Sequence, residues 1–192
     1  MKLTIIFHRI GKDFGSRLES KNKGGYIYLL SPTPELWSKA LRHRTQIVFS
    51  PDAAAILGNL NLVPGQIIVE AGTGSGSLTT SLARGIAPHG HVYTFEFNER
   101  RAELALEEFK INGLSNVVTA AHRDVCKDGF TEALLNKADA HFLDVPNPWM
   151  AIAHVHATLK VGGIFASYSP CIEQVQNTCE ALREHGFQST LF

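Results

Sequence analysis

From residue 65 onward, short apolar runs alternate with longer stretches of helical character. Five runs have the length and composition of buried strands: residues 66–71, 91–97, 116–121, 138–144 and 162–169. Helical patterns follow four of these runs, at residues 77–87, 99–112, 149–160 and 172–186. Strands connected by helices of this length form right-handed βαβ units. The sequence therefore predicts an α/β fold with a mostly parallel, doubly wound sheet.

The chain before residue 65 has a different pattern. GGYIYLLSP (residues 24–32) predicts a short strand bounded by turn residues, and PDAAAILGNLNLVPG (51–65) predicts a helix with proline at its first position. We expect a partial β-rich domain over residues 1–44 and a main α/β domain over residues 45–192.

Charge is distributed unequally between these parts. Residues 1–50 hold nine Lys and Arg against three Asp and Glu, a difference of +6, whereas residues 51–192 hold nine against fifteen, a difference of −6. This asymmetry predicts a basic arm that meets a polyanion such as a nucleic acid. A solvated basic surface without a partner is the alternative.

Several classes of protein are disfavoured by the sequence. No stretch approaches the roughly 18 apolar residues of a membrane-spanning helix, and the start, MKLTIIFHRI, meets His8 and Arg9 too early for a secretory signal. Three cysteines without CxxC spacing argue against a disulfide framework or a metal site and favour a reducing compartment. We therefore expect no membrane segment and no metal.

A glycine-rich turn, EAGTGSGS (residues 70–77), follows the first strand of the main domain. The dinucleotide pattern GxGxxG fails because Ser77 stands where the third small residue belongs, and no Gly-Lys-Ser/Thr follows for a phosphate loop. The remaining pattern, E-x-G-x-G-x-G, has the spacing of S-adenosylmethionine-binding loops. It indicates a cofactor loop that includes Gly72, Gly74 and Gly76.

Polar residues also follow the next two strands. Glu96 ends the second strand, where a carboxylate accepts hydrogen bonds from ribose hydroxyls. Asp124, with Val125 beside it, follows the third strand, where a polar side chain can reach an adenine amino group. Each signal alone is weak, but the three together at the carboxyl ends of strands indicate a nucleoside cofactor.

The fourth strand ends abruptly in FLDVPNPW (residues 142–149). We expect this strand beside the first, so that Asp144 faces the methyl-bearing end of the cofactor. A carboxylate there can accept a hydrogen bond from the exocyclic amine of a nucleobase and stabilise the positive charge that develops during methyl transfer. Trp149 or Tyr168 could stack on an extruded base. The alternative is that Asp144 caps the helix that starts near Trp149.

Together these stretches resemble one family, the catalytic subunit of the eukaryotic tRNA (adenine-58, N1) methyltransferase. The resemblance runs from about Arg9 to the end of the chain. It is carried by LSPTPELWSKALRHRTQIVFSPD (30–52), EAGTGSGS (70–77), FLDVPNPW (142–149) and YSPCIEQVQ (168–176). It implies a class I, Rossmann-like methyltransferase fold that uses S-adenosylmethionine.

The resemblance also implies roles for individual residues. Asp144 would be the catalytic carboxylate and would border the cofactor as well, and Arg101 would help Glu96 to orient the ribose. The further residues implied to hold the cofactor are Val48, Gly72, Gly74, Ser75, Gly76, Ser77, Asp124 and Val125. Those implied to line the substrate side are Gln46, Ile47, Phe49, Ser50, Leu143, Val145, Pro146, Ser169 and Pro170.

The family pattern further implies tRNA as substrate, a related non-catalytic subunit in a heterotetramer, and a nuclear location. It includes a longer amino-terminal β domain and an antiparallel sixth strand, within which QSTLF (residues 188–192) falls. We therefore expect the last strands of the sheet to be missing from this chain. Two alternatives remain: a methyltransferase for another substrate, and a non-catalytic subunit that binds RNA or a partner.

Overall fold

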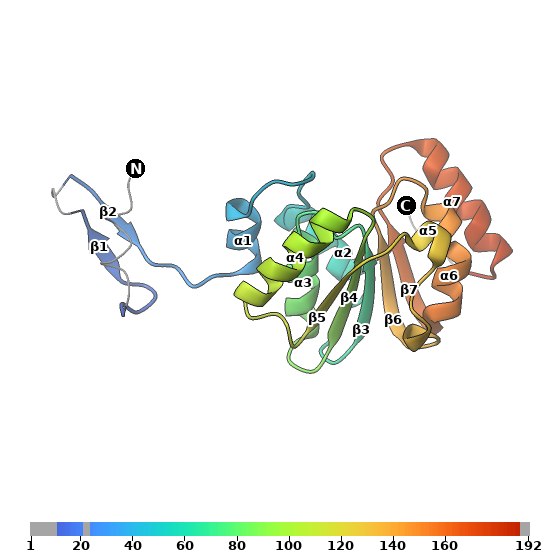
Figure 1. The fold of residues 1–192 in the computed structure, drawn as a ribbon, viewed down its shortest axis with the longest axis horizontal. Helices are drawn as coiled ribbons and strands as arrows, with labels where there is room; N and C mark the ends of the chain where they lie inside the picture. The colour runs from blue at the N-terminus through green and yellow to red at the C-terminus, as the bar shows by residue number, and fades with distance from the viewer. Residues whose placement is uncertain (1–10, 21–23, 189–192) are drawn as a thin grey trace.

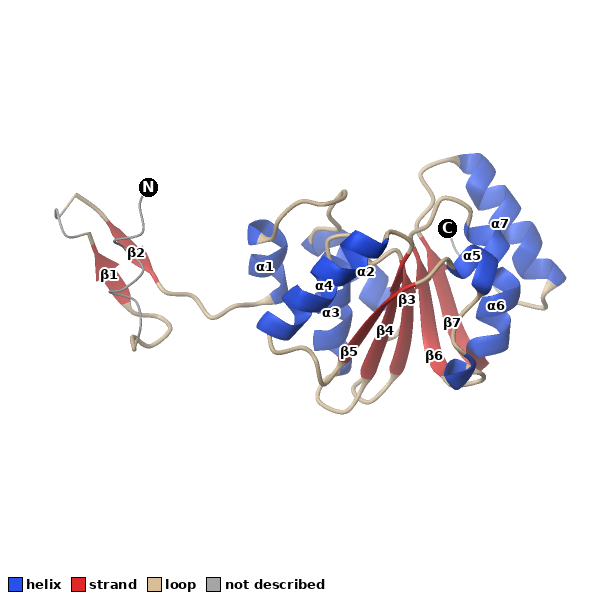
Figure 2. Cartoon of the chain, viewed as in Figure 1, coloured by secondary structure: helices blue, strands red, loops and turns tan. Residues whose placement is uncertain are grey.

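The computed structural model describes residues 11–20 and 24–188, and its centre is a parallel sheet (Figure 2). Five strands lie in the order β5-β4-β3-β6-β7, and all neighbouring pairs in this sheet are parallel. Their bounds are β3 (Ile67–Ala71), β4 (His91–Glu96), β5 (Val118–His122), β6 (Ala138–Leu143) and β7 (Leu159–Ser167). The predicted parallel α/β sheet is confirmed, as is the pairing of the first and fourth predicted strands, β3 and β6.

Helices cover both faces of this sheet (Figure 1). On one side lie α1 (Pro34–Ala40), α2 (Ser50–Asn59), α3 (Ser77–Ile86) and α4 (Glu99–Ile111). On the other lie α5 (Val125–Asp128), α6 (Ile152–Thr158) and α7 (Ile172–Glu184), together with the short 3-10 turns η2 (Glu132–Leu134) and η3 (Pro148–Ala151).

Each face of the sheet has its own apolar core because side chains alternate along every strand. Ile68 and Phe142 point to the first face, where they pack with Leu82 and Phe109 of the helices. Val69 and Leu143 belong to the second core, with Val155 of α6. Burial on both faces holds the sheet rigid, so its strand ends can position a site.

The amino-terminal part is a two-stranded antiparallel hairpin of β1 (Arg17–Glu19) and β2 (Tyr26–Tyr28). An extended segment joins the hairpin to α1, and the hairpin stands away from the body of the molecule (Figure 1). Tyr26 and Tyr28 are both exposed, with their rings in edge contact. The short strand predicted in residues 24–32 is present as β2.

Some predicted bounds are wrong. The helix predicted over residues 51–65 ends at Asn59, and Asn61 then adopts a positive φ of 50° that breaks the helix. The helix predicted over residues 149–160 begins as a 3-10 turn and ends at Thr158, so β7 starts earlier than predicted, at Leu159. Lys160 forms an ion pair with Asp139 of β6 at 2.6 Å, which favours the extended backbone there.

Four elements were not predicted: β1, α1, α5 and the 3-10 turn η2. Helix α1 begins with Thr33, whose hydroxyl accepts a hydrogen bond from the backbone N–H of Leu36, and Pro34 follows at the first helical position. This helix contacts α3. MKLTIIFHRI, and QSTLF beyond its first residue, lie outside the described residues.

Within the described ranges, no helix is long and apolar enough to cross a membrane. The same residues contain no cluster of three or more His, Cys, Asp or Glu side chains that could hold a metal ion.

Candidate functional site

A cavity of about 680 Å³ opens at the carboxyl ends of the central strands. Its floor is formed by the glycine loop after β3, and its walls by the segments that follow β4, β5 and β6. Fourteen residues expected in the site line it: Gln46, Val48, Gly72, Gly74, Ser75, Ser77, Glu96, Arg101, Asp124, Val125, Asp144, Val145, Pro146 and Pro170. Parallel sheets bind ligands at this edge, so the cavity is the candidate functional site.

The glycine loop brings two strand ends into contact. Gly72 has a φ of +97°, and a Cβ atom at this position would collide with the carbonyl oxygen of Asp144. The Asp144 backbone N–H in turn donates to the carbonyl oxygen of Ala71 at 2.8 Å. Only glycine allows this close approach, and it holds the Asp144 backbone against the start of the loop.

Glu96 lies at the end of β4, with only 3% of its surface exposed. Its Oε1 accepts hydrogen bonds from Nε and Nη2 of Arg101, at 3.0 and 2.6 Å, and from the Asn98 backbone at 3.0 Å. Its Oε2 accepts from the Gly74 backbone at 2.9 Å. A carboxylate oxygen has two lone pairs, so Oε2 can accept one further donor such as a ribose hydroxyl.

Asp124 has a second role besides the predicted one, because it begins α5. Its Oδ1 accepts hydrogen bonds from the backbone N–H groups of Cys126 and Lys127, at 3.1 and 3.3 Å. These bonds fix the side chain at the cavity wall. Its other carboxylate oxygen, Oδ2, makes no hydrogen bond within the described residues. It can therefore accept a hydrogen bond from an adenine amino group.

Asp144 lies at the open lip of the cavity. The residue as a whole is exposed, but the surrounding walls partly desolvate its carboxyl group, and this burial raises the pKa of Asp144 above its ordinary value. The 3-10 turn that follows starts at Asn147 without a side-chain cap, so Asp144 does not cap the next helix. A partly desolvated carboxylate is a stronger hydrogen-bond acceptor than one in bulk water.

Exposed apolar side chains surround the mouth of the cavity. Phe97, Met150 and Tyr168 all line it and are more than half exposed, at 68%, 52% and 58%. Trp149, the other residue considered for base stacking, is partly buried and is not part of the lining. The mouth therefore offers flat apolar surfaces, and Tyr168 is the better placed of the two stacking candidates.

The segment between α1 and α2 forms another wall, and we call residues 44–48 the strap. Thr45, Gln46 and Val48 line the cavity. Thr45 Oγ1 lies near Ser75 Oγ, at 3.3 Å. The strap thus closes the cavity on the side of the glycine loop.

Six expected residues do not line the cavity: Gly76, Ile47, Phe49, Ser50, Leu143 and Ser169. Gly76 precedes α3 and lies against Phe109, where a Cβ atom would be 2.9 Å from the ring. Ile47 and Leu143 are core residues, only 5% and 0% exposed. These two side chains point into the core, whereas Phe49 is 38% exposed outside the cavity.

Glu70 lines the cavity but was not predicted as a site residue, although it is the acidic residue of the E-x-G-x-G-x-G pattern. It is 1% exposed, and its Oε2 accepts hydrogen bonds from Thr79 Oγ1 and Thr94 Oγ1, at 2.5 and 2.7 Å. Burial raises the pKa of Glu70 to about 7. A buried carboxyl beside a cavity is a candidate partner for a cationic ligand group.

The glycine loop, the acidic end of β4 and the cavity at the carboxyl edge of the sheet define a class I S-adenosylmethionine-dependent methyltransferase fold. Sequence comparison identifies the family within this class. The family described as tRNA methyltransferase complex GCD14 subunit matches residues 25–191, and the chain belongs to this family.

Curated proteins similar to this chain are named as catalytic subunits of a tRNA methyltransferase. The chain is 51% identical over 181 residues to the tRNA (adenine(58)-N(1))-methyltransferase catalytic subunit of Dictyostelium discoideum. It is 46% identical over 184 residues to that of Schizosaccharomyces pombe. Each match covers 93% of this chain but only 58% and 50% of the two relatives, so the chain spans about half their length.

Solved structures agree with this fold. A SAM-dependent O-methyltransferase from Thermotoga maritima matches with a TM-score of 0.78 and 36% identity, covering 90% of this chain and 63% of that protein. The tRNA (m1A58) methyltransferase TrmI from Aquifex aeolicus matches with a TM-score of 0.72 and 25% identity, covering 89% and 73%.

Proposed function

We propose that this chain transfers a methyl group from S-adenosylmethionine to N1 of adenosine 58 in tRNA. The observation that carries the proposal is the position of Asp144, at the lip of a cavity whose floor is the glycine loop. The names of the curated relatives support the choice of substrate. Because this chain spans only part of their length, its own activity needs a direct test.

The residues present fit the cofactor. Glu96 has a free acceptor site for a ribose hydroxyl, Asp124 stands where an adenine would lie, and the buried Glu70 can meet a cationic amino group. The glycines leave room for close approach of a ligand to the backbone. When bound, the cofactor supplies a methyl group on a positively charged sulfur.

Asp144 would act on the other reactant. Its carboxylate accepts a hydrogen bond from the exocyclic amine of adenine and raises the nucleophilicity of N1. The same negative charge stabilises the positive charge that develops on the ring as the methyl group arrives. The cavity walls orient the base for in-line attack, which is the main requirement of a displacement reaction. Tyr168 and Phe97 offer surfaces on which the extruded base can stack.

The test is a methyl-transfer assay with an unmodified tRNA transcript, followed by digestion and nucleoside analysis. We expect label only in 1-methyladenosine, and no label in a matched transcript that carries guanosine at position 58. Label on protein, or on another base, would favour the rival methyltransferase interpretation. Absence of cofactor binding would favour a non-catalytic subunit.

We also propose a partner subunit, because the relatives are named as catalytic subunits. A heterotetramer with a related non-catalytic subunit, located in the nucleus, is the arrangement that the family resemblance implies. Co-purification of the tagged chain followed by mass measurement of the complex tests the assembly, and imaging of the tagged chain tests the location.

A further inference from the structure

The two serines of the glycine loop are engaged by the strap. The backbone N–H groups of Arg44 and Thr45 donate to Ser75 Oγ, at 3.0 and 3.2 Å. Ser77 Oγ donates to the carbonyl oxygen of Val48 at 2.6 Å. Both ends of the strap are therefore held by residues of the loop that is expected to bind the cofactor.

Arg44 connects the strap to a third element. Its Nη2 donates to the carbonyl oxygen of Ser75 at 3.2 Å, and its Nη1 lies 2.8 Å from Glu108 Oε2 on α4. The side chains of Arg44 and Glu108 are only 10% and 23% exposed. A guanidinium fork can make both contacts in fixed geometry, whereas a lysine ammonium cannot.

Helix α1 reaches the same loop through a buried hydroxyl pair. Ser38 Oγ lies 2.6 Å from Ser77 Oγ, and Ser38 is 3% exposed. Each hydroxyl also has a backbone carbonyl as acceptor, Val48 for Ser77 and Pro34 for Ser38, at 2.6 and 2.9 Å, so two protons serve three contacts. The loop, the strap and α1 thus form one hydrogen-bonded unit.

The opposite side of the strap faces the cavity. Gln46 is exposed at the cavity wall, on the side expected for the substrate. Thr45 packs so closely on the loop that a Cβ atom on Gly74 would lie 2.6 Å from its Oγ1. A displacement of the glycine loop would therefore move the strap, which forms the cavity wall that a substrate would contact.

We propose that the strap couples cofactor binding to the substrate side of the cavity, with Arg44 as the positioning residue. This inference rests on the proposed function. Cofactor on the glycine loop holds Ser75 and Ser77 in place, and these serines hold the strap. By linkage, a substrate that docks on the ordered strap strengthens cofactor binding by the same factor.

The test is hydrogen exchange of the strap in the whole chain, with and without S-adenosylhomocysteine. The amide N–H groups of Arg44 and Thr45 report on it directly, because both donate to Ser75. If opening of the strap requires release of the ligand, ligand at about 100 times its Kd should slow their exchange by up to about 100-fold.

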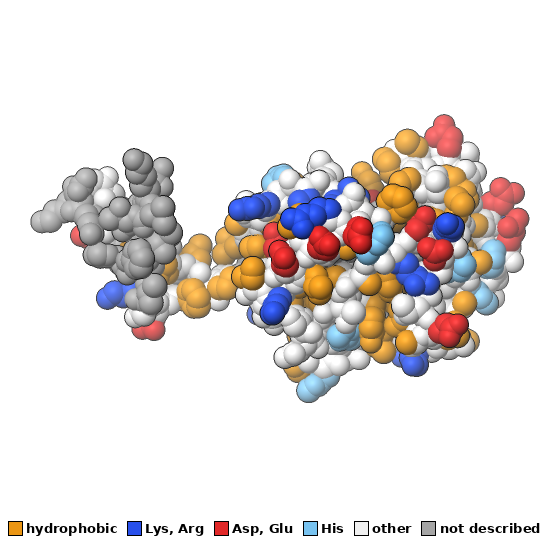
Figure 3. Space-filling view, viewed as in Figure 1, with side chains coloured by type: hydrophobic (Ala, Val, Ile, Leu, Met, Phe, Trp, Pro, Cys, Tyr) orange, Lys and Arg blue, Asp and Glu red, His pale blue; other side chains and the backbone are white. Residues whose placement is uncertain are grey.

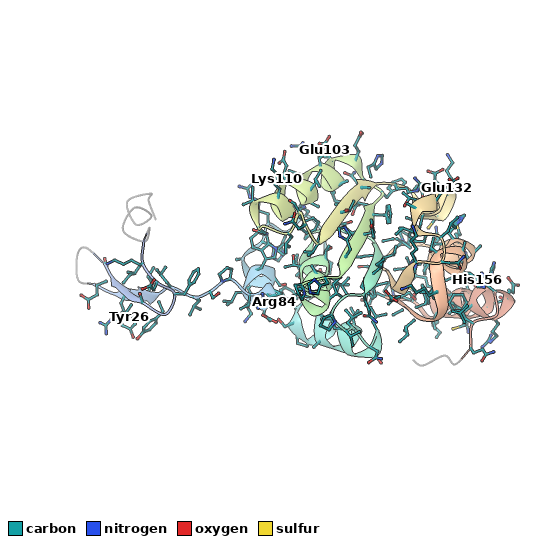
Figure 4. The ribbon with its side chains drawn as sticks, turned by 90° about the horizontal axis from the view of Figure 1, so that it is seen from below. Tyr26, Arg84, Glu103, Lys110, Glu132 and His156 are labelled. Carbon is teal, nitrogen blue, oxygen red and sulfur yellow. The ribbon has the colours of Figure 1, made fainter. Side chains whose placement is uncertain are left out.

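Arg44→Lys keeps the positive charge but lacks the planar guanidinium group that contacts Ser75 and Glu108 together. We expect it to weaken S-adenosylhomocysteine binding by about tenfold, the loss of one charge-assisted hydrogen bond, and to abolish most of the ligand-induced protection of the strap. Arg100→Lys is the matched control. Arg100 pairs with Glu103 at 2.9 Å, both side chains are more than half exposed, and neither lines the cavity; Glu103 points outward from α4 (Figure 4).

Two results would overturn the coupling. One is that the amides of Arg44 and Thr45 in the unaltered chain exchange at the same rate with and without bound S-adenosylhomocysteine. The other is an Arg44→Lys variant that binds and protects like Arg100→Lys, even if it melts at a lower temperature, since Arg44 would then be structural only. A chain that binds no S-adenosylhomocysteine would overturn the proposed function together with this inference.

Discussion

At the scale of single residues, two buried titratable groups give the free energy of unfolding opposite dependences on pH. Glu70 is charged only at a cost because it is buried, and its pKa is raised to about 7 from an ordinary 4.5. His141 is fully buried on the other face of the sheet, and burial lowers its pKa to about 3 from an ordinary 6.5. Both groups therefore favour the folded state in their neutral forms.

Because the pKa of Glu70 is raised in the folded state, its contribution to the free energy of unfolding is fully present below pH 4.5 and is lost as the pH rises through 7. Glu70→Gln keeps an acceptor for Thr79 and Thr94 and cannot ionise. We expect the variant to gain about 3 kcal/mol of unfolding free energy relative to the parent between pH 4.5 and 9. Chemical denaturation at a series of pH values measures this, and two parallel stability curves would contradict it.

For His141 the sign is reversed. Stability is fully present above pH 6.5, the ordinary pKa of histidine, and is lost as the pH falls toward 3. Between pH 6.5 and 4, the free energy of unfolding should fall by about 3 kcal/mol less in His141→Phe than in the parent. This difference is independent of the absolute stability of the variant. Acid titration of both proteins by circular dichroism tests this. An unchanged acid midpoint would show that other groups control acid unfolding.

At the scale of elements, the sheet and its strand ends were predictable, whereas the contacts between distant segments were not. Strand positions follow from apolar runs, and the site follows because parallel strands end at one edge. The family resemblance implied Gln46 and Val48 at the site, but the hydrogen bonds of the strap could not be foreseen, since they join Arg44 to Ser75, 31 residues away. Glu70 was missed although its pattern was visible, because its burial next to the cavity depends on tertiary packing.

The glycine loop provides a test at this scale. Gly72→Ala would force a Cβ atom into the carbonyl oxygen of Asp144 and requires a positive φ. We expect a loss of at least about 1 kcal/mol of stability, together with a displaced Asp144 and weaker methyl transfer. Gly58→Ala in α2 is the control, because its Cβ meets nothing within 4 Å, and it should gain about 0.5–1 kcal/mol. Equal effects of the two variants would contradict this account of the loop.

At the scale of the whole molecule, the chain divides into an outlying hairpin and a body that holds the cavity (Figure 1). Tyr26 lies on the hairpin, away from the body (Figure 4). On the visible face, basic side chains cluster over the region of α1 and α4, with acidic side chains directly beside them, and further acidic side chains lie toward the α7 end (Figure 3). The excess of basic residues lies in residues 1–50, with nine Lys and Arg against three Asp and Glu, so the amino-terminal part is the candidate contact for a polyanion.

Removal of residues 1–32 should therefore separate two kinds of binding. The cavity lining begins at Thr45, so we expect the affinity for S-adenosylhomocysteine to stay within about twofold. Binding of tRNA should weaken and depend less steeply on salt, because fewer cations are released per complex. Titrations at several salt concentrations measure both. An unchanged salt dependence would show that the amino-terminal residues do not meet RNA.

The central claim is that Asp144 assists methyl transfer to adenine rather than holding the cofactor or the fold. The measurement is single-turnover methylation of a tRNA transcript by the parent chain and by Asp144→Asn, with cofactor affinity determined on the same samples. We predict cofactor affinity within about threefold and a transfer rate lower by about 100- to 1,000-fold. A transfer rate that is unchanged, or that falls only in proportion to cofactor affinity, would contradict the claim.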